Sequence, residues 1–137
     1  MSPEIPSRLI RMSENKIYVA VVDDDDSFAR ALGRLLRAAG FEAILYSSAE
    51  AFLVPTPLPS PACVVLDIEL GGMSGLELHR HLNARGATTP VIFVTAHDEP
   101  EVRDQAREIG CAAYFRKPVP GKLLVEAITN AVNANPK

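Results

Sequence analysis

The sequence predicts one domain of the α/β class, in which a parallel β-sheet is covered by helices on both faces. Short apolar runs rich in β-branched and aromatic residues alternate with longer stretches whose apolar residues recur at helical spacing. The length of 137 residues and the 47% content of hydrophobic residues suit a single domain with a substantial core. We expect a flexible extension over residues 1–15 and the folded domain over residues 16–135.

Five runs have the length of β-strands, namely 17–22, 41–46, 62–67, 90–95 and 112–117. The first, third and fourth are nearly continuous in apolar residues, which is typical of strands that are buried on both faces. The second run mixes polar and apolar residues. It is therefore expected toward an edge of the sheet.

Helical spacing follows each predicted strand. The predicted helices cover 28–39, 49–54, 76–84, 99–109 and 121–132. Asp25 or Asp26 is expected to cap the first helix, and Ser47 or Ser48 the second. The second helix should be short, because the proline-rich stretch 55–61 cannot continue it.

Charge and composition argue against several classes of function. The formal net charge of −3 offers no broad attraction for nucleic-acid phosphates, so direct nucleic-acid binding by this chain is not expected. There is neither a membrane-spanning run nor the apolar core of a signal peptide, which favours a cytoplasmic protein off the membrane. Cys63 and Cys111 lie in apolar segments and are expected as buried thiols. His79 and His81 are poor joint metal ligands and are expected at the surface.

Polar residues stand at the carboxyl ends of four predicted strands, where open parallel sheets bind ligands. They are Asp23 and Asp24 after the first strand, Asp67 ending the third, Thr95 ending the fourth and Lys117 ending the fifth. Crowded carboxylates raise each other's pKa, and a hard cation such as Mg²⁺ relieves this repulsion. A lysine can pair with a phosphoryl oxygen, and a threonine hydroxyl can donate a hydrogen bond. Each residue alone is ordinary, but their joint placement predicts a magnesium and phosphoryl site.

Four motifs at these positions resemble the receiver domain of two-component response regulators, over about residues 16 to 134. The motifs are VVDDDD (21–26), VVLDIELGGMSGLEL (64–78), VIFVTAHD (91–98) and AAYFRKP (112–118). The resemblance implies the flavodoxin-like, CheY-like topology, with five helices and a five-stranded parallel sheet in the order 2-1-3-4-5. The segment YSSAEAFL (46–53) looks especially like receivers of the FixJ type, which normally precede a helix-turn-helix DNA-binding domain. The chain is then a stand-alone receiver or the first domain of a transcription factor, and this segment favours the second.

The resemblance also implies a role for each acidic residue. Asp67 resembles the aspartate that accepts a phosphoryl group from a sensor histidine kinase or a histidine phosphotransfer protein. Asp23 and Asp24 resemble the acidic pair that holds Mg²⁺ together with Asp67, and Asp24 is favoured as the direct ligand. The main-chain carbonyl of Glu69 is implied as a further ligand. Mn²⁺ could substitute for Mg²⁺.

The remaining motif residues resemble the switch of the family. Thr95 corresponds to the switch hydroxyl and Tyr114 to the aromatic residue that changes rotamer on activation. Lys117 corresponds to the lysine that pairs with the phosphoryl group, and a cis peptide is implied between Lys117 and Pro118.

Two features of the loops are specific to this sequence. The side chains of Glu69 and His97 stand where the family tunes phosphoryl hydrolysis, and both are expected to be modulators at most. Gly71 replaces a proline that many receivers have at this position. The loop over residues 68–75 is therefore predicted to be less restricted.

The resulting hypothesis is Mg-dependent phosphotransfer onto Asp67, in which the chain catalyses only its own phosphorylation and dephosphorylation. The surface formed by 99–109, 112–117 and 121–132 would then change, for dimerisation or partner binding. A haloacid dehalogenase-like phosphatase is one alternative, although Glu69 stands where such enzymes have a second aspartate. A receiver-like module that signals without phosphorylation is the other, and the complete set of site residues argues against it.

Overall fold

In the computed structural model, which describes residues 17–134, the strands form one parallel sheet in the order β2-β1-β3-β4-β5. The strands are β1 (Ile17–Val22), β2 (Phe41–Tyr46), β3 (Cys63–Asp67), β4 (Val91–Thr95) and β5 (Ala113–Arg116). The order and the edge position of β2 confirm the predictions, and strand ends differ from the predicted ones by at most one residue. The flexible extension expected over residues 1–15 lies outside the described residues.

Five helices connect and cover the strands within residues 17–134. They are α2 (Asp26–Ala38), α3 (Ala49–Phe52), α4 (Gly75–Ala84), α5 (Pro100–Ile109) and α6 (Gly121–Ala134). Helix α2 begins where the Asp25 side chain accepts the Phe28 N–H, and α3 begins where Ser48 accepts the Ala51 N–H. Only four residues of α3 are helical before the proline-rich stretch. None of the helices in this part of the chain is both long and apolar enough to span a bilayer.

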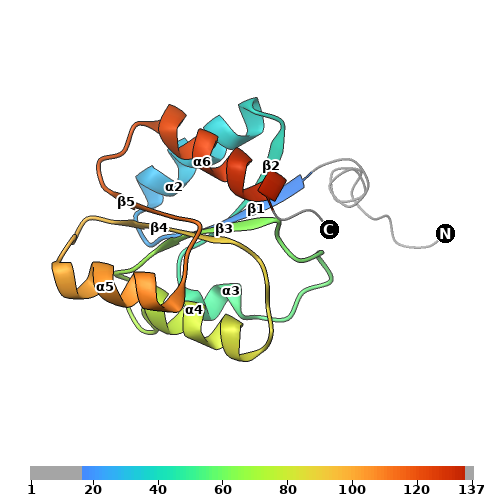
Figure 1. The fold of residues 1–137 in the computed structure, drawn as a ribbon. Coiled ribbons are helices and arrows are strands. Elements are labelled where there is room, and N and C mark those ends of the chain that lie inside the picture. Colours follow the sequence, from blue (N-terminus) through green and yellow to red (C-terminus); the bar gives the residue numbers. More distant parts are fainter. Residues whose placement is uncertain (1–16, 135–137) are drawn as a thin grey trace.

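The sheet lies between two layers of helices, with α2 and α6 on one face and α3, α4 and α5 on the other (Figure 1). Successive side chains of a strand point to opposite faces, so each strand contributes side chains to two cores, one on each face of the sheet. In β1, Val19 and Val21 pack in the core beneath α2 and α6, while Ala20 and Val22 pack on the opposite side. Every residue of β3 and β4 is buried, as their continuous apolar runs predicted.

Two residues occupy environments that the sequence analysis did not expect. His79 was expected at the surface, but it is buried on α4, where its Nε2 contacts the Gly110 carbonyl and its ring meets Phe93 edge to face. A hydrogen-bond partner at the end of α5 makes this burial tolerable. Cys111 is half-buried, whereas Cys63 is buried as expected, and both thiols are free.

Candidate functional site

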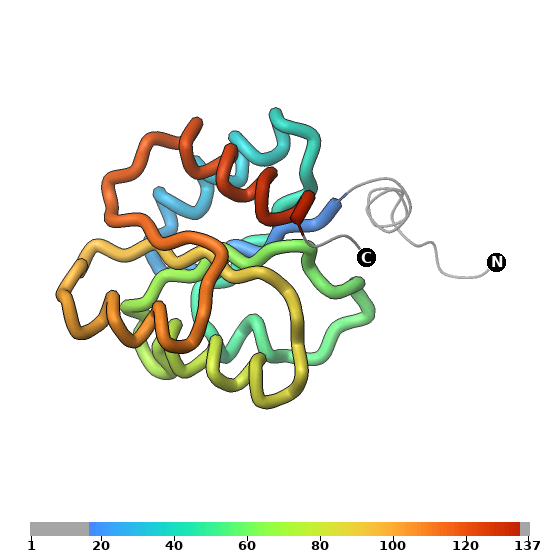
Figure 2. The backbone as a smooth tube through the Cα atoms, viewed as in Figure 1, coloured from blue at the N-terminus to red at the C-terminus, as the bar shows by residue number. Residues whose placement is uncertain are grey.

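The loops that follow the central strands gather at one end of the sheet, at the left of Figure 2. Asp67 is the last residue of β3 and Thr95 is the last residue of β4. Asp23 directly follows β1, and Lys117 directly follows β5. Because neighbouring parallel strands end at the same edge, residues that are up to 94 positions apart in sequence meet in one site.

Three carboxylates form the acidic part of this site. One oxygen from each of Asp23, Asp24 and Asp67 lies within 4.8 Å of the others. Asp23 and Asp67 are only 3% and 5% exposed, whereas Asp24 is exposed to solvent. Oδ1 of Asp23 accepts the Asp25 N–H at 2.8 Å, and Oδ1 of Asp67 accepts the Glu69 N–H at 3.0 Å. These hydrogen bonds from the following loops orient the two buried carboxylates.

Lys117 brings the positive charge into the same cluster. Its Nζ atom lies 2.8 Å from Oδ2 of Asp23 and 3.7 Å from Oδ2 of Asp67. The ammonium group also lies 4.4 Å from the centroid of the Phe28 ring. The Lys117 side chain is largely buried, and the peptide bond between Lys117 and Pro118 is cis, as the family resemblance implied.

The charges of the site perturb its titration. Burial raises the pKa of Asp67 to about 7, and the nearby charge of Asp23 adds to the rise against the opposing effect of Lys117. Burial acts to lower the pKa of Lys117, but its hydrogen bond to Asp23 and the charges of Asp23 and Asp67 outweigh this effect and raise it. One ammonium thus faces a surplus of carboxylates. An all-oxygen donor set with excess negative charge fits a hard divalent cation.

Thr95 is fully buried, and its hydroxyl is bonded within the loop that follows β4. Oγ1 accepts the His97 N–H at 3.0 Å and donates to the His97 carbonyl at 3.3 Å. Donation to a phosphoryl oxygen would require Oγ1 to give up the second of these bonds. The exposed side chains of His97 and Glu69 face each other, with 3.6 Å between Nε2 and Oε1. This contact lies between the loops that follow β3 and β4.

Tyr114 in β5 is half-buried and is held through Asp98, which also binds Arg103. Its hydroxyl donates to Oδ1 of Asp98 at 3.1 Å, and Nε of Arg103 donates to the same oxygen at 3.0 Å. Burial, followed by the hydrogen bond to Asp98, raises the pKa of Tyr114 to about 12. Tyr114 was identified from the sequence, but its partner Asp98, the last residue of the VIFVTAHD motif, and Arg103, five residues further on, were not.

Helix α4 begins against the main chain of Asp67. The Gly75 N–H donates to the Ile68 carbonyl at 3.0 Å. A Cβ atom at Gly75 would clash with the carbonyl of Asp67 and the backbone of Ile68, so this close approach requires glycine. Gly75 therefore helps to set where the acidic end of β3 sits.

A long-range hydrogen bond restrains the loop between β3 and α4. Oε2 of Glu50, at the start of α3, accepts the Met73 N–H at 2.8 Å. The same carboxylate lies against Gly72, whose φ of +84° is in the region that favours glycine. The replacement of proline by Gly71 predicted a less restricted loop, and Glu50 supplies a restraint that no local pattern revealed.

Comparisons with known proteins agree with the architecture of this site. Residues 19–129 match the family model of the response regulator receiver domain. The transcriptional regulatory protein FixJ of Azorhizobium caulinodans is 36% identical over 110 residues, which are 80% of this chain and 52% of FixJ. The response regulator protein TodT of Pseudomonas putida is 31% identical over 129 residues, which are 94% of this chain and 57% of TodT.

A solved structure shows the same fold. The crystal structure of a response regulator receiver protein from Burkholderia phymatum superposes with a TM-score of 0.75 at 42% identity, covering 86% of this chain and 96% of that protein. The chain spans about half the length of the two curated relatives, at 52% and 57%.

Proposed function

Because this chain belongs to the response regulator receiver family, whose standard function is phosphoryl acceptance, we propose that Asp67 is its acceptor. The observation that carries this proposal is the position of Asp67 at the end of β3, buried and 3.7 Å from the Lys117 ammonium. Oδ1 of Asp67 is bonded to the Glu69 N–H, so we assign Oδ2 as the attacking atom. The phosphoryl donor would be a sensor histidine kinase or a histidine phosphotransfer protein.

Mg²⁺, or Mn²⁺ in its place, would be held by carboxylates of Asp23, Asp24 and Asp67 and by the main-chain carbonyl of Glu69. Among the carboxylates, the exposed one of Asp24 is best placed to take the ion from water. When bound, the ion supplies positive charge to the oxygens of the transferring phosphoryl group.

The residues of the chain account for the transfer step. Oδ2 of Asp67 attacks phosphorus, and the bond between phosphorus and the donor's imidazole nitrogen breaks. The electron pair of that bond stays on the imidazole nitrogen. Lys117 pairs with a phosphoryl oxygen and offsets its charge. Attack of water on the same phosphorus releases phosphate and restores Asp67, so the chain catalyses only its own phosphorylation and dephosphorylation.

The phosphoryl group then shifts the switch residues. It adds a charge of about −1.5 to −2, which draws the Thr95 hydroxyl away from the His97 carbonyl. The space that Thr95 leaves admits Tyr114 once its hydroxyl releases Asp98. The readout surface is α5, β5 and α6, which we propose as the site of dimerisation or partner binding.

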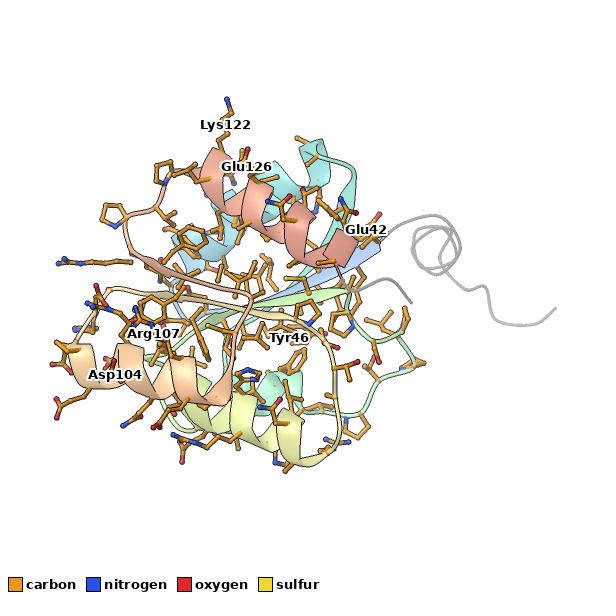
Figure 3. The ribbon with its side chains drawn as sticks, viewed as in Figure 1. Glu42, Tyr46, Asp104, Arg107, Lys122 and Glu126 are labelled. Atoms are coloured by element: carbon orange, nitrogen blue, oxygen red, sulfur yellow. The ribbon has the colours of Figure 1, made fainter. Side chains whose placement is uncertain are left out.

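Exposed charges on the readout surface suit a specific interface. Figure 3 labels four of them, Asp104 and Arg107 on α5 and Lys122 and Glu126 on α6. Charges of both signs can pair across a dimer. We place the protein in the cytoplasm, where its free thiols remain reduced.

Intact mass spectrometry after incubation with acetyl phosphate and Mg²⁺ tests the proposal. We expect one labile phosphoryl adduct that is absent after EDTA treatment and in the Asp67→Asn variant. Steady release of phosphate from phosphomonoesters would favour a phosphatase instead. The absence of both an adduct and beryllofluoride binding would favour a module that signals without phosphorylation.

A further inference from the structure

The ring of Phe28 faces the ammonium group of the site. Phe28 lies in the first turn of α2 and is half-buried, and the Lys117 Nζ atom is 4.4 Å from its ring centroid. This distance is inside the range of about 6 Å over which an aromatic face attracts a cation. The Phe28 N–H donates to the Asp25 carboxylate at 3.1 Å, which fixes the start of the helix that carries the ring.

The contacts of Lys117 differ in what a bound metal would do to them. Asp23 and Asp67 pair with the ammonium and also belong to the carboxylate group that fits a divalent cation. A cation on those oxygens competes with Lys117 for them and repels its charge. The Phe28 ring offers no oxygen ligand. Of these three contacts of Lys117, the one with Phe28 is therefore the contact that metal binding would leave intact.

We propose that Phe28 is a positioning residue for Lys117. Its ring holds the ammonium at the edge of the site while the carboxylates of Asp23 and Asp67 bind the metal. Lys117 is then in place to pair with the incoming phosphoryl group. This inference rests on the proposed function and adds a residue that acts through the lysine rather than on the substrate.

Phe28 also packs against the core between the sheet and helices α2 and α6, so its replacement would affect stability as well. The two roles predict different results for Phe28→Leu, which keeps an apolar side chain without a π face. A positioning role predicts about fivefold weaker binding of beryllofluoride, from the size of a partly buried cation–π contact. Mg²⁺ affinity would stay unchanged. A packing role alone predicts that both affinities fall together.

The sharper test keeps the shape of the ring. Nonsense suppression in the full chain replaces Phe28 by phenylalanines with one to four ring fluorines, which progressively weaken the negative face of the ring. The matched control is the same series at Phe41, a half-buried ring packed against the same core but at the start of β2. We expect the logarithm of the acetyl phosphate phosphorylation rate to fall linearly with fluorine number at Phe28. The Phe41 series should remain flat.

A second readout does not depend on phosphorylation. Ring currents should shift the NMR signals of the Lys117 ε-methylene protons upfield, and we expect this shift to persist in saturating Mg²⁺ and to vanish in Phe28→Leu. Loss of the shift on adding Mg²⁺ to the unmodified protein, or a flat fluorine series at Phe28, would overturn the positioning role. If the unmodified protein accepts no phosphoryl group while the shift persists, the proposed function fails but the contact stands.

Discussion

Neutralising the proposed acceptor should stabilise the metal-free protein. In the absence of metal, burial and the charge of Asp23 raise the pKa of Asp67 from 3.8 to about 7. The native state therefore keeps a proton that the unfolded chain has released, and stability falls as pH rises from about 4 to about 7. At about 1.4 kcal/mol per pH unit, a dry site would lose about 4 kcal/mol. Water at the open edge of the site reduces our expected loss to about 2 kcal/mol.

Urea denaturation in EDTA measures this effect directly. At pH 8, Asp67→Asn should be about 2 kcal/mol more stable than the unmodified protein, and the difference should disappear near pH 4. Adding Mg²⁺ at pH 8 should stabilise the unmodified protein but not the variant, because ligand binding to the native state adds stability. The control is Glu126→Gln, which removes an exposed carboxylate on α6. Equal stability of Asp67→Asn and the unmodified protein at pH 8, or the same gain in Glu126→Gln, would refute this reasoning.

Three further predictions concern the residues around the site. Glu50→Ala should speed amide exchange at Met73, because the hydrogen bond that holds this N–H is lost; unchanged exchange would show that the loop needs no such anchor. Asp98→Ala should lower the pKa of Tyr114 from about 12 in an NMR titration, and the pKa should stay above its ordinary value because the ring remains partly buried. An unchanged pKa would contradict a role for the hydrogen bond. Gly75→Ala should destabilise the fold by about 1 to 3 kcal/mol in thermal melts, since its Cβ has no room, and an unchanged Tm would argue against the close approach.

The parts of the fold that the sequence predicts best depend on local patterns. The strands β3 and β4 are buried on both faces, so hydrophobicity marks them to within one residue. The C-terminal end of α3 was predicted less well, because the helix ends at Phe52 and the prediction extended to residue 54. Helix ends are set by the balance of caps and prolines, and this balance leaves a weaker mark on the sequence than burial does.

Local sequence patterns did not predict the contacts between residues that are far apart in the chain. His79 reads as a surface histidine on a helix, because its partner is the Gly110 carbonyl, 31 residues away. The restraint from Glu50 on Met73 crosses 23 residues and ends on a main-chain N–H, which every residue type except proline provides. At the site, strand ends predicted which residues meet. The distances that place Lys117 between Asp23 and the Phe28 ring emerged only from the structure.

Locating the phosphoryl group tests the central claim most directly. Borohydride reduces an aspartyl phosphate to homoserine, so the chain would be incubated with acetyl phosphate and Mg²⁺, reduced, digested and sequenced by mass spectrometry. We predict homoserine at position 67 and its absence when Mg²⁺ is withheld. Homoserine at position 23 or 24 in place of 67 would contradict the assignment of Asp67 as the acceptor.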